Sequence, residues 1–252
     1  SNWIKKDLNL DKYSLIVSDN LLETLEFDKK AIIIGSFLWH HQFNDKEIFD
    51  NSELMIAKNN PIIISNKYFT PDYMYNYKNN IKVGFNYRRP NQNSKIKKSI
   101  LIANGKEEKD DSRVVELINL INLKQNNNLE SIFLEPRLHN DKLSPIFKKA
   151  DFDEKMYSKI SHAIIRPGLG TITDCISNDI RIISYNKWEM NELNFNIECL
   201  YKIGLIDIFK NNNEIVGFLE DINSNLRPYN LKDIDFNGSE ETAKIIFDYL
   251  NE

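Results

Sequence analysis

Short apolar runs alternate with amphipathic segments along most of the chain. The apolar runs predict buried β-strands at residues 13–18, 31–37, 61–65, 99–103, 131–135, 162–165 and 181–185. Apolar residues at helical spacing predict α-helices at residues 21–25, 46–58, 112–123, 155–160, 172–176, 192–203, 214–222 and 240–250. Because strands that alternate with helices are typical of parallel sheets, the pattern predicts an α/β fold.

One stretch, residues 161–204, carries the most informative pattern. A buried strand runs into the sequence RPGLGT, which begins at Arg166, and a helix, a second strand and a second helix follow. In a parallel sheet such a turn lies outside the carboxyl ends of the strands, where ligands bind. The stretch therefore predicts a binding site at this turn.

The turn contains residues that suit a phosphate group. Gly168 and Gly170 remove two side chains, so a ligand can approach the backbone closely. The N–H groups of the helix start, with Thr171 in the first turn, suit a phosphate or diphosphate, and Arg166 can add positive charge. Asp174, one turn further, can accept hydrogen bonds from a diol such as a ribose.

Two polar residues of the following helix extend this candidate site. Glu192 and Asn196 are four positions apart, so they share one helix face and can hydrogen-bond sugar hydroxyls. Each candidate also has a structural explanation. Gly-x-Gly turns often serve tight packing, an aspartate near a helix start offsets the helix dipole, and the helix face can be simply solvated. The order and spacing of the whole set favour a site.

The sequences RPGLGTITD and, further along, ELNFNI resemble the donor-binding half of GT-B glycosyltransferases, most closely the peptidoglycan lipid-intermediate N-acetylglucosaminyltransferase and related UDP-sugar transferases. The resemblance implies two Rossmann-like domains. It places Asp174 where a carboxylate holds the nucleotide ribose, and Glu192 and Asn196 where side chains face the donor sugar. Leu193 and Ile197 depart from the family, which has Gln and Ala at these positions.

The resemblance adds two further positions to the nucleotide-sugar site. Gly105 stands where the related enzymes carry a glycine loop after the first strand of the donor domain. Phe152 begins a segment, residues 152–156, that resembles the loop whose backbone reads the base.

A polar, proline-containing segment at residues 88–98 predicts a linker between two domains. Residues 1–90 are expected to form a partial N-terminal acceptor-side α/β domain, and residues 97–252 the C-terminal donor-binding domain. Members of the resembled family open with a strand and a glycine-rich loop, which nothing before Tyr13 supplies. The first domain is therefore expected to be incomplete, and a missing N-terminal region or a partner subunit is left open.

His40 and His41 follow a predicted strand end beside Trp39, and they are the weak candidates for a catalytic acid or base. The alternative is a surface loop that Trp39 anchors. Adjacent histidines without a third nearby ligand rarely complete a zinc site, so the sequence predicts no metal ligands. No DxD-type metal dependence is evident, which predicts a metal-independent donor site.

Composition narrows the class of protein. The chain has 252 residues and a net charge of −4 with both signs interspersed, which argues against nucleic-acid binding. Cys175 and Cys199 fall on apolar helix faces and are expected to be buried thiols. Since no apolar run approaches the ~20 residues of a membrane span and no secretory signal is visible, a cytoplasmic location is expected. Peripheral membrane association is left open.

Together these features predict a glycosyltransferase that moves a hexose from a nucleotide sugar, UDP-linked by resemblance, to an unidentified acceptor. The resemblance implies a glycan or lipid-linked acceptor, as in cell-surface polysaccharide biosynthesis. No cofactor is expected, because the nucleotide sugar is itself a substrate. Two alternatives stay open: a nucleotide-sugar hydrolase or epimerase on the same fold, and a non-catalytic donor-domain subunit.

Overall fold

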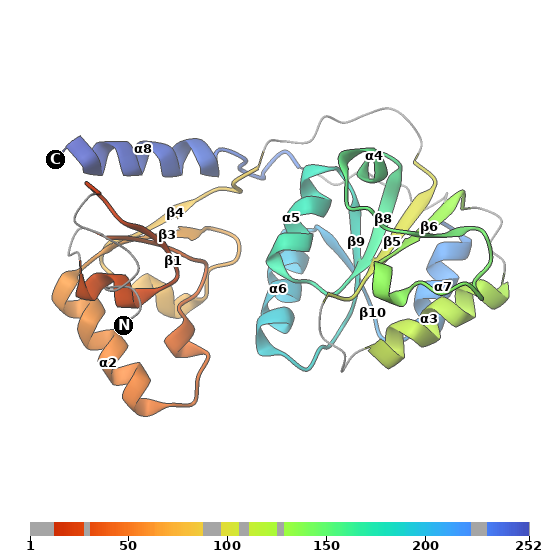
Figure 1. Ribbon diagram of the computed structural model, residues 1–252, viewed down its shortest axis with the longest axis horizontal. Helices are drawn as coiled ribbons and strands as arrows, with labels where there is room; N and C mark the ends of the chain where they lie inside the picture. The colour runs from red at the N-terminus through yellow and green to blue at the C-terminus, as the bar shows by residue number, and fades with distance from the viewer. Residues whose placement is uncertain are drawn as a thin grey trace. The chain divides into compact units, whose positions relative to one another are not determined.

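The computed structural model describes residues 13–27, 31–87, 97–105, 111–124, 129–222 and 231–251. The chain forms two compact units, each built on one parallel sheet (Figure 1). The first unit contains Ser1–Arg88 and Ile234–Glu252, and the second contains Arg89–Asp233. Most of the predicted linker, residues 88–96, lies outside the described residues.

The first unit has a four-stranded sheet in the order β1-β2-β3-β4. Its strands are β1 (Val17–Asp19), β2 (Ile32–Ile34), β3 (Ile62–Asn66) and β4 (Asn80–Val83). Its helices are the 3-10 turns η2 (Leu22–Glu26), η3 (Trp39–His41) and η4 (Asp72–Asn76), and the α-helices α2 (Lys46–Asn59) and α8 (Gly238–Asn251).

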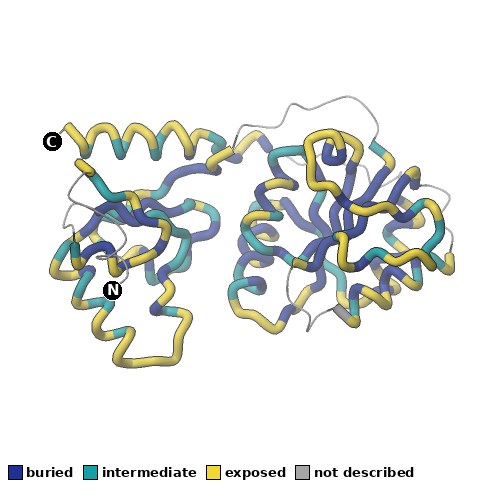
Figure 2. The backbone as a smooth tube through the Cα atoms, viewed as in Figure 1, coloured by how far each residue is buried: buried dark blue, intermediate teal, exposed yellow. Residues whose placement is uncertain are grey.

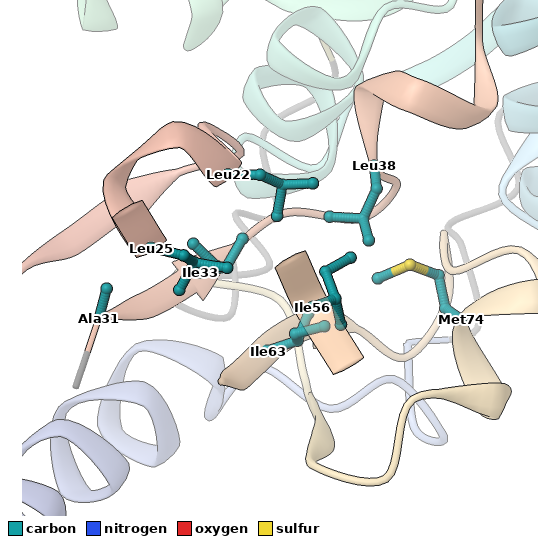
Figure 3. Close-up of a cluster of buried hydrophobic side chains, with 8 residues drawn as sticks. All are labelled: Leu22, Leu25, Ala31, Ile33, Leu38, Ile56, Ile63 and Met74. Atoms are coloured by element: carbon teal, nitrogen blue, oxygen red, sulfur yellow. The ribbon is translucent and has the colours of Figure 1, made fainter. Parts of the chain in front are cut away.

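Alternate residues of these strands enter different hydrophobic clusters, because successive strand side chains point to opposite faces. On one face Ile33 and Ile63 pack with residues of η2, α2 and η4. Figure 3 shows the eight buried residues of this cluster: Leu22, Leu25, Ala31, Ile33, Leu38, Ile56, Ile63 and Met74. Burying a side chain of this kind is worth about 1.5–3 kcal/mol, so this cluster stabilises the packing of η2, α2 and η4 on this face of the sheet.

The opposite face of the same sheet is covered by α8. Ile32, Ile64 and Val83 are buried there against Ile245 and Ile246. The sequence assigned this helix to the C-terminal domain of residues 97–252, and the structure corrects that boundary. The physical reason is that the sheet of the first unit has a second apolar face, and the apolar stripe of α8 covers it.

Polar contacts hold the start of α8 and the residues just before it against the rest of the first unit. The Gly84 N–H donates a 2.9 Å hydrogen bond to Glu241 Oε2, and Lys67 forms a 2.6 Å ion pair with Asp235. The backbone is too close for side chains at this point, since a Cβ on Gly238 would lie 2.2 Å from the Gly84 carbonyl oxygen. The start of α8 therefore depends on glycine at this contact.

The second unit has a six-stranded parallel sheet in the order β10-β9-β8-β5-β6-β7. Its strands are β5 (Ser99–Ala103), β6 (Ser131–Leu134), β7 (Phe147–Lys149), β8 (Ile160–Ile165), β9 (Arg181–Tyr185) and β10 (Ile206–Phe209). Its helices are α3 (Asp111–Lys124), η5 (Pro136–Leu138), α4 (Glu154–Tyr157), α5 (Leu169–Ser177), α6 (Asn191–Lys202) and α7 (Asn212–Glu220).

Helices cover both faces of this sheet. Figure 1 shows α5 and α6 on one side and α3 and α7 on the other. The central strands β5 and β8 are consequently buried at every residue (Figure 2), which is typical of a parallel sheet between helices. The glycine turn follows directly after β8, one of these two buried strands.

Most predicted helices and strands are present, but their first and last residues differ from the prediction. The strands at 99–103 and 181–185 agree with β5 and β9, whereas the strand expected at 13–18 is displaced to β1. The sequence did not predict β7 or β10. Both are sheet edges: β7 has one buried residue followed by two exposed lysines, and β10 is mostly half-buried, so neither is a clear apolar run. Within the described residues, no helix combines the length and hydrophobicity of a membrane span.

Candidate functional site

The candidate site lies at the carboxyl ends of β5 and β8, which are neighbours in the sheet. Their last residues, Ala103 and Ile165, are in register, and the Arg166 N–H donates to the Ala103 carbonyl at 3.1 Å. From β5 the chain continues to β6 on one side, while from β8 it continues to β9 on the other. Loops that diverge in this way leave a crevice where open α/β sheets bind ligands.

The glycine turn forms the start of α5. Gly168 is the N-cap residue, and no side chain caps this helix. The first N–H groups of a helix have no partner within it, so they can donate to an anion. A Cβ at Gly168 or Gly170 would meet no atom within 4 Å. Close packing within the protein therefore does not explain these two glycines, and the space beside them is open.

Gly105 and Arg166 come together in the structure. Gly105 has a φ of +70°, which favours glycine, and Arg166 Nη1 lies 3.3 Å from the position of a Cβ there. The N–H groups of Asn104 and Gly105 both donate to Glu135 Oε2, each at 2.9 Å. Sequence reasoning missed Glu135. Its carboxylate accepts from both N–H groups of this loop, so they are already paired within the protein.

The Arg166 guanidinium also contacts a second loop. Its Nη2 donates to the sulfur of Met190 at 2.8 Å, in the segment between β9 and α6. Arg166 thus spans the loops after β5 and β9 at the crevice. A cation at this position can neutralise negative charge that develops on a leaving group.

Asp174 is exposed on α5, where it accepts a 3.3 Å hydrogen bond from the Tyr157 hydroxyl. Partial desolvation raises the pKa of Asp174, and the hydrogen bond from Tyr157 opposes this shift. Tyr157, which sequence reasoning missed, comes from α4 and so ties the candidate base-reading segment to α5. The residue nevertheless remains exposed to solvent.

Phe152 stands directly before α4 and has an unusual conformation. Its φ is +53°, in the left-handed region that non-glycine residues rarely adopt, and its side chain is 42% exposed. The adjacent Asp153 caps α4 by accepting a 2.7 Å hydrogen bond from the Met156 N–H. The capped helix holds Phe152 at the surface, where an aromatic ring can stack on a base.

Glu192 and Asn196 do not share one environment. Asn196 is 2% exposed, and its amide donates to the Pro167 carbonyl at 2.9 Å, so it supports the glycine turn from behind. Glu192 is half-buried in the first turn of α6. Between them, Asn194 accepts from the Trp188 N–H and donates to the Trp188 carbonyl, both at 2.8 Å, and so closes the loop before α6. The sequence spacing of these residues did not indicate their hydrogen bonds to backbone atoms.

His40 and His41 lie in the first unit, in η3. His40 is 2% exposed, and its Nε2 is 2.7 Å from Glu53 Oε1. His41 Nε2 is 2.9 Å from the Tyr77 hydroxyl and 3.4 Å from the same carboxylate oxygen. The alternative interpretation, a surface loop, does not fit His40, because its side chain is buried and α2 brings Glu53 against the pair. The expectation of no metal ligand rested on the lack of a third group, which Glu53 supplies.

This packing shifts the pKa values of His41 and Glu53. Burial, together with the charge of His40, lowers the pKa of His41. Burial raises the pKa of Glu53, but hydrogen bonds from Tyr77 and His40 outweigh burial and hold that pKa below its ordinary value. Glu53 is therefore ionised at neutral pH, with the His41 imidazole neutral beside it.

Two units of this kind, each on a Rossmann-like parallel sheet, are consistent with a partial GT-B glycosyltransferase fold, and solved glycosyltransferases match this chain in structure. The calicheamicin glycosyltransferase CalG4 matches with a TM-score of 0.63 and 11% identity, over 100% of this chain and 77% of that chain. The glycotransferase of kitacinnamycin matches with a TM-score of 0.61 and 12% identity, over 99% and 79%. SnogD from Streptomyces nogalater matches with a TM-score of 0.58 and 10% identity, over 97% and 74%.

At these identities the likeness establishes the fold and leaves the substrates open. No protein-family model matches the sequence, and a search of curated proteins finds no match.

Proposed function

We propose that the protein is a glycosyltransferase that moves a hexose from a UDP-sugar bound by the second unit. The observation that carries the proposal is the uncapped start of α5, with open space at Gly168 and Gly170, at the switch point of the sheet. The GT-B fold supports the reaction class, and the motifs RPGLGTITD and ELNFNI support a UDP-linked donor.

The residues of the site suggest how the chain would assist transfer. The N–H groups of Gly170 and Thr171 would hold the diphosphate, and Arg166 would stabilise the charge that develops as the sugar leaves. Asp174 would accept hydrogen bonds from the ribose, and Phe152 would contact the base. Since these groups can stabilise the leaving diphosphate themselves, the donor site would need no metal ion.

The proposal assigns different tasks to the α6 residues. Glu192 would contact the donor sugar, whereas Asn196 would position the turn through the Pro167 carbonyl, which accepts its hydrogen bond. The acceptor would be a glycan or a lipid-linked sugar, as in the UDP-sugar transferases that the motifs resemble. His40 is too buried to reach an acceptor hydroxyl, so the proposal leaves the catalytic base unassigned.

Product analysis tests the reaction. The full chain is incubated with a panel of UDP- and TDP-sugars, with and without simple glycan acceptors, and the products are separated by mass spectrometry. Sugar on an acceptor supports transfer. Free sugar with donor alone supports the hydrolase alternative, and an altered but still nucleotide-linked sugar supports the epimerase. If every donor is recovered intact and none binds, the enzymatic proposal is wrong.

A further inference from the structure

Four polar side-chain atoms from three segments of the first unit converge on one point. They are His40 Nε2, His41 Nε2, Glu53 Oε1 and the Tyr77 hydroxyl oxygen. Glu53 Oε1 is 2.7 Å from His40 and 3.4 Å from His41, and it accepts a hydrogen bond from Tyr77. The Tyr77 oxygen is 2.9 Å from His41 Nε2 and 3.5 Å from His40 Nε2. The two histidines and the carboxylate lie within 4.8 Å of one another.

These separations approach those of a metal site. Zinc binds histidine nitrogen and carboxylate oxygen at about 2.0–2.2 Å, so ligand atoms around a tetrahedral ion lie about 3.3–3.5 Å apart. The contact between His41 and Glu53 already has this spacing, at 3.4 Å. The contact between His40 and Glu53, at 2.7 Å, would have to open by less than about 1 Å.

The surrounding packing holds the imidazoles in place. The His41 ring stacks on Tyr73 with a centroid distance of 3.7 Å, and the Tyr73 hydroxyl accepts a 3.1 Å hydrogen bond from the Leu38 N–H. Phe49 meets the His41 ring edge-on at 5.0 Å. Fixed ligand rings lower the cost of ordering on binding, so the cluster is preorganised.

The cluster also opens on one side. A cavity of about 390 Å³ is lined by His41, Glu53 and Tyr77 among other residues of this unit. His40 does not line this cavity and is almost fully buried. Three protein ligands with one position open to a cavity is the arrangement of zinc sites that bind a water or a small ligand.

We propose that His40, His41 and Glu53 bind a divalent transition-metal ion, with Zn²⁺ the best fit, and leave a fourth position open to the cavity beside Tyr77. Two imidazoles and one carboxylate favour zinc or its first-row neighbours over Mg²⁺, which prefers oxygen ligands. The Tyr77 hydroxyl is an outer partner that can hydrogen-bond a fourth ligand. This proposal is independent of sugar transfer, because the residues of the donor site all belong to the second unit.

Metal titration of the full chain, freed of metal with a chelator, tests the proposal. Calorimetry should show one equivalent of Zn²⁺ bound, with Mg²⁺ far weaker. Added Co²⁺ should give the intense visible d–d bands of a four- or five-coordinate ion. Absence of Zn²⁺ binding, or only the faint spectrum of six-coordinate Co²⁺, would show that the cluster is a metal-free hydrogen-bond network.

Variants assign the ligands. Mutating an outer partner of a metal ligand typically costs about 10–100-fold in metal affinity. His41→Ala removes a ligand itself, so it should weaken Zn²⁺ binding by more than about 100-fold. Tyr77→Phe removes only an outer partner, so it should weaken Zn²⁺ binding less. Glu53→Gln, which keeps the side-chain shape, should also lose Zn²⁺. His139→Ala, a histidine of the second unit, is the matched control and should bind as wild type does. Equal affinity in wild type and His41→Ala would overturn the assignment.

Discussion

His162, in the middle of the central strand β8, should make the stability of the second unit depend on pH. Its side chain is 1% exposed, and burial together with the nearby Arg181 lowers its pKa to about 4, while Asp207 opposes the shift. In the unfolded chain the pKa returns to about 6.5. The folded state therefore favours the neutral imidazole and must exclude a proton that the unfolded chain binds.

The sign and size of the effect follow from these two values. Well above about pH 6.5 both states carry a neutral imidazole, and the contribution to stability is complete. As the pH falls from about 6.5 towards about 4, the unfolded state gains the proton first and stability is lost. A difference of about 2.5 pKa units corresponds to about 3 kcal/mol in total, and to about 2.5 kcal/mol by pH 4.5.

Urea unfolding of wild type and His162→Leu at pH 7 and pH 4.5 measures this contribution. Leucine keeps the buried volume but cannot be protonated. Carboxylates that titrate over the same range contribute equally to both proteins, so the difference between them isolates His162. Wild type should lose about 2.5 kcal/mol more than the variant between the two pH values. If both proteins lose the same stability, the imidazole is accessible to protons in the folded state and the reasoning is wrong.

Three further predictions concern single contacts. Gly238→Ala should destabilise the first unit by about 1–3 kcal/mol in urea, because its Cβ would lie 2.2 Å from the Gly84 oxygen, whereas Gly217→Ala, which meets nothing within 4 Å, should cost nothing. Asn196→Ala should cost about 1–3 kcal/mol of stability, since it leaves the Pro167 carbonyl unpaired. Glu192→Ala should weaken UDP-sugar binding in calorimetry while leaving UDP binding unchanged, and equal losses would remove Glu192 from the sugar site.

The fold was largely predictable because its periodicities are local. β5 and β9 are short segments rich in apolar residues, and α3 and α6 show helical spacing, so neighbouring residues alone identify them. The position of α8 was not predictable. Its apolar stripe identifies an amphipathic helix but does not say which of two sheets it covers.

The sequence could indicate candidate site residues where one segment carries them, as in the glycine turn at Gly168. It could not indicate them where the partner is distant in sequence or is a backbone atom. Asn196 pairs with a carbonyl 29 positions away, and Glu135 accepts from N–H groups 30 and 31 positions away. Glu53 reaches His40 because helix α2 packs beside η3, a tertiary contact that spacing does not encode.

Titration of UDP into wild type and Asp174→Ala by calorimetry tests the central claim most directly. Asp248→Ala, the same change at an exposed position of α8, is the control. Hydrogen bonds to a charged group are worth about 1.5–3 kcal/mol, so UDP should bind wild type and the control alike and bind Asp174→Ala about 10–150-fold more weakly. A folded wild-type protein that gives no heat with UDP, or an Asp174→Ala variant with unchanged affinity, would contradict a nucleotide site at this turn.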